Sequence, residues 1–203
     1  WVQLLTCDPG YNSNFSHQSE QFQLSVPEHP LVPDEPTTSL ESTHSFSHTT
    51  VGSDYRRLYN QLRVDHGEDQ SSEKIVGGDF EEVGLQEIEI LRYLGLKETD
   101  FLVDVGCGSG RLAIPLPNTH KGGYLGTDVV PELLEYARQR VRRKDWRFEL
   151  VEELIIPQPD QTADMICFFS VFTHLLHEQT FLYLKEALRV LKPGGRIVFS
   201  FLD

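Results

Sequence analysis

Apolar and polar positions in the second half of the chain follow two spacings that alternate along the sequence. Residues 81–96 have apolar side chains three and four positions apart, which predicts an amphipathic helix that ends at Gly95. The inward stripe of this helix would consist of Leu85, Ile88, Leu91 and Leu94. The mostly apolar run 101–105 that follows is typical of a buried strand.

The same two patterns repeat to residue 203. The further predicted strands are 123–128, 147–151, 163–169 and 196–202, and the predicted helices are 131–142 and 178–191. The inward positions of the last helix would be Phe181, Leu184, Leu188 and Leu191. Strands joined by crossover helices predict an α/β fold with a doubly wound, mostly parallel sheet and helices on both faces.

The chain divides into three parts by composition. Residues 1–55 contain no Lys or Arg, are rich in Ser, Thr, Pro and His, and are expected to be disordered or loosely packed. Within them, 20–26 alternates in polarity and could form an isolated strand. Residues 56–80 read as a linker with a short amphipathic helix near 55–67, and 81–203 as the α/β domain.

Composition excludes several functions. The formal net charge of −13 argues against a nucleic-acid partner, which would need a basic surface. No apolar run is long enough to span a membrane. The cysteines show neither a CxxC pair nor a zinc-ligand spacing, so no metal site and a reducing, cytoplasmic location are expected. They are Cys7, Cys107 and Cys167.

Three glycines at alternate positions follow the first predicted strand of the domain. In an open α/β sheet this turn faces the ligand site beyond the carboxyl ends of the strands. A phosphate-binding loop needs a Lys after its last glycine, and none is present. A dinucleotide fingerprint would place its third glycine at Arg111, which disfavours an NAD-binding oxidoreductase but leaves it as an alternative.

The turn sequence 104-DVGCGSG-110 resembles motif I of the Rossmann-like (class I) S-adenosylmethionine (SAM) methyltransferases, in particular the methyltransferase type 11/25-like group. Residues 124–138 resemble the second strand, acidic residue and helix of that family. Residues 163–175 are similar to its fourth strand and loop, and 191–200 (LKPGGRIVFS) to its LKPGG turn and fifth strand. The resemblance covers roughly residues 80–203 and implies SAM as the cofactor.

SAM carries a sulfonium cation and no phosphate, so a turn without Lys suits it. The resemblance implies cofactor contacts from Asp104, Gly106, Cys107, Gly108, Gly110, Asp128, Val129, Glu152 and Ser170. Asp128 would accept hydrogen bonds from the ribose hydroxyls, although it could instead cap the helix at Pro131. Asp104 would orient the turn or the methionine ammonium. Glu152 stands at the adenine position, where most relatives have Asp, with Glu153 as a rival.

The implied reaction is in-line methyl transfer to a small-molecule or lipid- or sugar-linked acceptor. His174 follows the fourth strand of the domain and is the candidate general base, although it could simply form a helix-entry turn. Cys167 reads as a strand residue rather than a nucleophile. A relative that binds SAM without catalysis is a further alternative.

The resemblance implies a domain that is shorter than its relatives at the carboxyl end. The family usually continues with two more strands, and here the sequence ends after the fifth, so the sheet is expected to be truncated there. The apolar run 197–199 would then form an unpaired sheet edge. Either the chain is cut, or part of residues 1–55 covers that edge.

Overall fold

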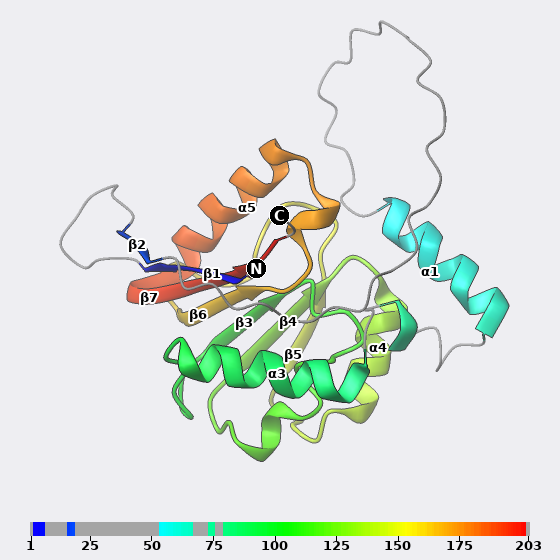
Figure 1. Cartoon of the computed structure of the whole chain (residues 1–203), viewed down its shortest axis with the longest axis horizontal. Helices are drawn as coiled ribbons and strands as arrows, with labels where there is room; N and C mark the ends of the chain where they lie inside the picture. The colour runs from blue at the N-terminus through cyan, green and yellow to red at the C-terminus, as the bar shows by residue number, and fades with distance from the viewer. Residues whose placement is uncertain (1, 7–15, 19–52, 67–72, 76–78, 202–203) are drawn as a thin grey trace, which may run out of the picture.

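The computed structural model describes residues 2–6, 16–18, 53–66, 73–75 and 79–201 (Figure 1). The elements are, in chain order, β1 (Val2–Thr6), β2 (Ser16–Gln18), α1 (Ser53–His66), α3 (Phe80–Tyr93), β3 (Leu102–Val105), the 3₁₀ helix η1 (Leu116–Asn118), β4 (Tyr124–Asp128), α4 (Pro131–Arg140), β5 (Arg147–Leu150), β6 (Ala163–Phe168), the 3₁₀ helix η2 (Phe172–His174), α5 (His177–Val190) and β7 (Leu191–Ser200).

A single twisted sheet organises these elements in the order β2-β1-β7-β6-β3-β4-β5. Strands β3 to β7 pair in parallel, whereas β1 and β2 run antiparallel to their neighbours. The predicted α/β class and mostly parallel sheet are confirmed. Because the carboxyl ends of parallel strands share one edge, the loops after β3, β4, β5 and β6 lie together there.

Helices pack on both faces of the sheet and define two hydrophobic clusters. Figure 1 shows α3 and α5 on opposite sides of the strands. On one face Leu91 of α3 and Leu134 of α4 belong to the same buried cluster. On the other face Tyr183 and Ala187 of α5 pack against Ile166 of β6. Burial of these apolar side chains is the main favourable term that holds the layers together.

Two predicted helix stripes were partly wrong. Leu85 of α3 is 55% exposed, because the helix instead turns Gly84 and Glu87 toward the interior. Phe181 of α5 is 66% exposed, and Tyr183 takes the buried place. In each helix the buried face therefore differs from the predicted one by part of a turn. Apolarity alone could not find the α3 face, since its buried residues include a glycine and a carboxylate.

Strand β1 covers the apolar edge of β7. It pairs antiparallel with β7 from Val2 opposite Ser200 to Thr6 opposite Arg196, and β2 extends the sheet beyond it. Part of residues 1–55 therefore completes the sheet, which corrects the expectation of loose packing for residues 2–6. The suggested strand 20–26 lies outside the described residues, and the domain boundary near residue 55 stays a prediction.

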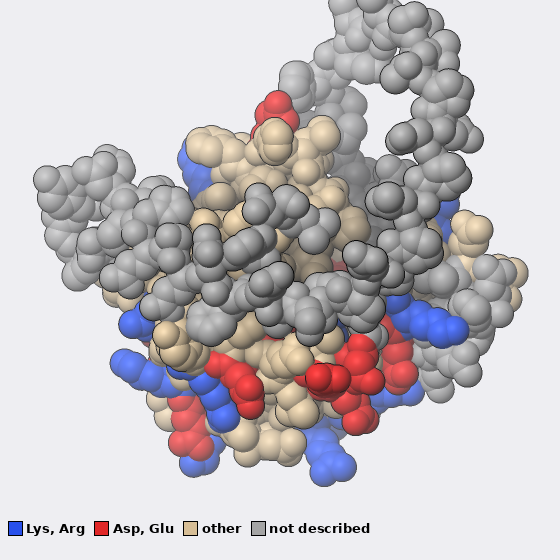
Figure 2. Space-filling model, viewed as in Figure 1, with Lys and Arg blue, Asp and Glu red and all other residues tan. Residues whose placement is uncertain are grey.

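Helix α1 confirms the short helix predicted in the linker. Its Tyr59 is fully buried against Val130 and Leu133 at the start of α4. None of the helices described here is long and apolar enough to cross a membrane. On the face seen in Figure 2, the acidic and basic side chains of the described residues are intermixed.

A close contact joins α3 to the glycine turn. A Cβ on Gly84 would lie 2.3 Å from the carbonyl oxygen of Arg111, so the helix can approach the turn only because this position has no side chain. One turn further along α3, Glu87 forms a buried ion pair with Arg111 at 2.5 Å. Burial raises the pKa of Glu87 to about 7, although Arg111 opposes that shift. Arg111, which breaks the dinucleotide pattern, thus anchors the turn to α3.

The Gly84→Ala substitution should lower the free energy of unfolding by about 1–3 kcal/mol, because the added methyl forces α3 away from the Arg111 backbone. Thermal or denaturant unfolding measures the effect. Leu85→Ala is the matched control on the same helix, and it should change stability much less, since Leu85 is largely exposed. Equal stability of the Gly84 variant and the wild type would contradict the described packing.

Candidate functional site

The glycine turn has a backbone that residues with a side chain rarely adopt. The φ angles of Gly106, Gly108 and Gly110 are +74°, +53° and +84°. The amide groups of Gly106 and Cys107 both donate to the carbonyl oxygen of Thr127, at 2.8 and 2.9 Å, which docks the turn onto the end of β4. The three predicted glycines therefore form one tight structure between β3 and β4.

Neighbouring segments pack closely against this turn on two sides. A Cβ on Gly106 would lie 2.5 Å from Cγ2 of Val171, in the loop that follows β6. A Cβ on Gly110 would lie 2.9 Å from Cβ of Ala137 on α4. The turn is thus held between the β6 loop and α4, and both glycines are required sterically as well as conformationally.

Asp128 links the glycine turn to the segment after β4. The amide of Gly108 donates to its Oδ2 and the amide of Val130 to its Oδ1, both at 2.9 Å. The residue is only 6% exposed, and burial raises the pKa of its carboxyl to about 6, while the backbone hydrogen bonds oppose that shift. Each carboxylate oxygen has two lone pairs, so these bonds leave acceptor capacity for a ligand.

Asp104 lies beneath the turn and is almost fully buried. The hydroxyl of Tyr124 donates to its Oδ2 at 2.6 Å, and the thiol of Cys167 lies 3.5 Å from its Oδ1. Burial raises the pKa of Asp104 to about 6. Burial also raises the pKa of the Cys107 and Cys167 thiols, which keeps both protonated. The sequence did not single out Tyr124, because a strand tyrosine usually serves only packing.

Arg56 of α1 reaches the ends of β4 and β5. Its Nη2 donates to the carbonyl oxygen of Val129 and lies 3.1 Å from Oε1 of Glu152. Val129 and Glu152, which the sequence analysis assigned to cofactor binding, are therefore held by Arg56, which it did not identify. No local signal could have found Arg56, since it is one of several charged residues on an amphipathic helix far away along the chain.

The loop after β6 carries the remaining predicted residues. Ser170 has a φ of +59°, and its amide donates to Oγ of Ser200 at 2.7 Å. His174 is the last residue of the 3₁₀ helix η2 and is exposed overall. Partial desolvation of its imidazole lowers the pKa of that ring. Because Val171 of this loop packs on Gly106, His174 lies in the loop that adjoins the turn.

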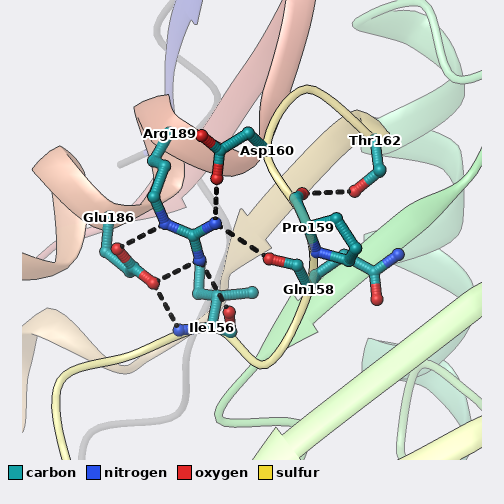
Figure 3. Close-up of polar contacts among 7 residues, drawn as sticks. All are labelled: Ile156, Gln158, Pro159, Asp160, Thr162, Glu186 and Arg189. Carbon is teal, nitrogen blue, oxygen red and sulfur yellow. Dashed lines mark hydrogen bonds and ion pairs between the residues drawn. The ribbon is translucent and has the colours of Figure 1, made fainter.

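The segment that leads from Glu152 back to β6 is braced by Arg189 of α5 (Figure 3). Its guanidinium bonds to the carboxylates of Glu186 and Asp160, with shortest distances of 2.6 Å. It also donates to the carbonyl oxygens of Ile156 and Gln158, at 3.0 and 2.9 Å. An irregular connection without a helix of its own thereby keeps a fixed path.

The predicted site residues thus converge on the carboxyl edge of four parallel strands. They come from the ends of β3 (Asp104 to Gly110), β4 (Asp128, Val129), β5 (Glu152) and β6 (Ser170). A cavity of about 470 Å³ lies elsewhere, beside the last turn of α3 and η1, and includes none of these residues. Among the described residues, no group of His, Cys, Asp or Glu is arranged to hold a metal ion.

Comparison with known proteins agrees with this architecture. Residues 103–199 match the family model described as a methyltransferase domain. An uncharacterized methyltransferase of Schizosaccharomyces pombe is 31% identical over 118 residues, which is 53% of this chain and 41% of that protein. A demethylmenaquinone methyltransferase of Deinococcus radiodurans is 37% identical over 101 residues, or 48% of this chain and 41% of that protein.

A crystal structure of a Pyrococcus horikoshii protein supports the fold. It superimposes with a TM-score of 0.53 at 21% identity, covering 61% of this chain and 59% of that one. In sequence, residues 103–199 of the α/β domain thus resemble methyltransferase domains, and the structural comparison supports the fold. The chain spans about two fifths of the length of the two curated relatives described above.

Alanine at Gly106 should destabilise the protein more than alanine at Gly194, which is a conformationally matched control. Both glycines have similar positive φ angles, +74° and +79°, so both substitutions carry the backbone strain of about 1–2 kcal/mol. Only Gly106 also has Val171 in the way, whereas nothing lies within 4 Å of a Cβ on Gly194. Denaturant unfolding compares the two, and an equal loss would show that the packing of the β6 loop on the turn is dispensable.

Proposed function

We propose that this chain transfers the methyl group of SAM to a small-molecule acceptor, and that its glycine turn and Asp128 hold the cofactor. The observation that carries the proposal is the joint geometry of these two features. The three positive-φ glycines leave the backbone open to close approach, and Asp128 lies beside them at the end of the next strand. The family of the domain supports the same cofactor.

The residues of the site suit a ligand with a cation and no phosphate. Asp104 and Asp128 are buried carboxylates beside the turn, and Arg111, which follows the turn, is paired with the buried Glu87. A phosphate would require donors or positive charge from the turn, as in phosphate-binding loops. When bound, SAM would supply a methyl group activated by its sulfonium sulfur.

The chain's own residues then have distinct tasks. Asp128 would accept hydrogen bonds from the ribose hydroxyls, and Glu152 would lie near the adenine. Asp104 would orient the turn from below through its bonds to Tyr124 and Cys167. The neighbouring loop would close the site against water, because in-line transfer depends mainly on alignment and exclusion of solvent.

The acceptor would bind beside the loop after β6. Large apolar side chains are exposed there, on the first turns of α5. They are Leu176, Phe181 and Leu182. The Deinococcus radiodurans relative is named for a demethylmenaquinone acceptor, which also supports a small molecule with apolar character. His174 would remove a proton from an acceptor hydroxyl, since the lowered pKa of its imidazole keeps it neutral near pH 7.

Cofactor binding should depend on the ionisation of Asp128. Calorimetry should detect binding of S-adenosylhomocysteine (SAH), and the affinity should fall as the pH drops through about 6, because the protonated carboxyl accepts fewer hydrogen bonds. Asp128→Asn should weaken binding by about 10–100-fold at pH 7.5 and flatten this dependence. Glu135→Gln, an exposed carboxylate of α4, is the control. Binding of NAD without any binding of SAH would instead favour a dinucleotide enzyme.

His174→Ala should reduce turnover by about 100-fold or more while SAH affinity stays within a small factor of the wild type. Turnover by the wild type should decline at acidic pH, below the ordinary pKa of histidine, because the imidazole must be neutral to act as a base. His177→Ala, three residues away and also exposed, serves as the control. Full turnover of the His174 variant on an acceptor that the wild type methylates would exclude the base role.

A further inference from the structure

Helix α1 is fixed onto the part of the site where β4 and β5 end. Tyr59, fully buried, packs with Val130 and Leu133, which follow Asp128 directly along the chain. Three residues after Leu133 on α4, Tyr136 donates to Glu73 at 2.7 Å, which attaches the segment after α1 as well. The position of α1 relative to Asp128 is therefore determined by a small hydrophobic cluster and a polar bond.

This attachment brings a cation to the ends of β4 and β5. Arg56 lies three residues before Tyr59, so the two side chains share a face of the helix. Its Nη2 contacts both the Val129 carbonyl oxygen and the Glu152 carboxylate, and thereby joins the ends of two neighbouring strands. Its Nε is buried and has no hydrogen-bond partner among the described residues. The side chain as a whole is only 37% exposed.

We infer that Arg56 is a positioning residue of the cofactor site, which holds Glu152 and the Val129 backbone in place for the ribose and adenine. The inference rests on the proposed function and extends it to α1. A guanidinium that bonds simultaneously to a carbonyl and a carboxylate fixes both, whereas a point charge would only attract them. Without it, Glu152 would be an exposed side chain free to rotate.

The charged and titratable groups around Asp128 determine the sign of the electrostatic effect. Asp104 lies beneath the glycine turn and Cys107 lies within it, while Tyr183 comes from α5. None of these groups supplies positive charge. Two arginines also adjoin the turn: Arg111 is paired with Glu87, and Arg138 donates to the carbonyl oxygen of Phe148. The charge of Arg56 favours the ionised form of Asp128. Removal of the guanidinium charge should therefore raise the pKa of Asp128 and shift cofactor binding to higher pH.

Three variants in the full chain test this assignment by SAH calorimetry across pH 5 to 8. Arg56→Gln removes the charge and the double contact, Arg56→Lys keeps only the charge, and Arg57→Gln is the control for the same charge change at an exposed neighbour. Thermal unfolding of each variant establishes that α1 remains folded. A double variant with Glu152→Gln measures whether the two side chains act together.

We expect Arg56→Gln to weaken SAH binding about tenfold and to shift the midpoint of its pH dependence upward, with Arg57→Gln unchanged. Arg56→Lys should restore the midpoint without restoring the full affinity. The effects of Arg56→Gln and Glu152→Gln should be less than additive. Wild-type affinity and midpoint in folded Arg56→Gln would overturn the inference and leave the proposed function intact, whereas failure of the wild type to bind SAH would overturn both.

Discussion

The carboxylate of Asp128 is the constraint on which the geometry of the site depends. It bonds to one amide in the turn after β3 and to another in the segment that starts α4, so two separate loops take their positions from one side chain. Its strand, β4, also supplies the Thr127 carbonyl that receives two amides of the turn. Because the carboxylate is nearly buried, these bonds are made in a medium of low polarity and are stronger than they would be in water. The same group thus organises the site and keeps lone pairs that can accept from a ligand.

A second constraint acts from the opposite side of the turn. Gly84 lets α3 approach the backbone of Arg111, and the buried pair of Glu87 and Arg111 fixes their orientation. A buried ion pair adds little net stability compared with apolar residues, but loss of one partner leaves an uncompensated charge. The ion pair therefore acts mainly by fixing the orientation of α3 relative to the glycine turn. This also explains why an arginine occupies the place where a dinucleotide fold would have its third glycine.

Much of the fold could be predicted from the sequence, because buried parallel strands and crossover helices leave strong periodic patterns. The predicted strands and helices lie within a few residues of β3 to β6, α4 and α5. The last strand was predicted from 196, but β7 begins at Leu191 and includes the expected turn at 192–195. The predicted burial of Leu85 and Phe181 was wrong. The packing of α3 on the glycine turn and the exposure of the start of α5 depend on tertiary contacts, which periodicity does not reveal. For the site, the acidic and glycine positions follow from local spacing. Arg56 and Tyr124 could not be found in this way, because their roles arise from contacts between segments distant in sequence.

The position of β1 has a consequence for the order in which the molecule folds. Val2 pairs with Ser200, so the partners of this strand are separated by almost the whole length of the described chain. Such contacts carry a high entropic cost of loop closure and form slowly. During synthesis β1 emerges before β7, so it can pair with β2 but cannot join the main sheet until β7 has been made. The edge of the sheet is therefore completed last, and the interval before that step is when the apolar edge of β7 is open to other chains.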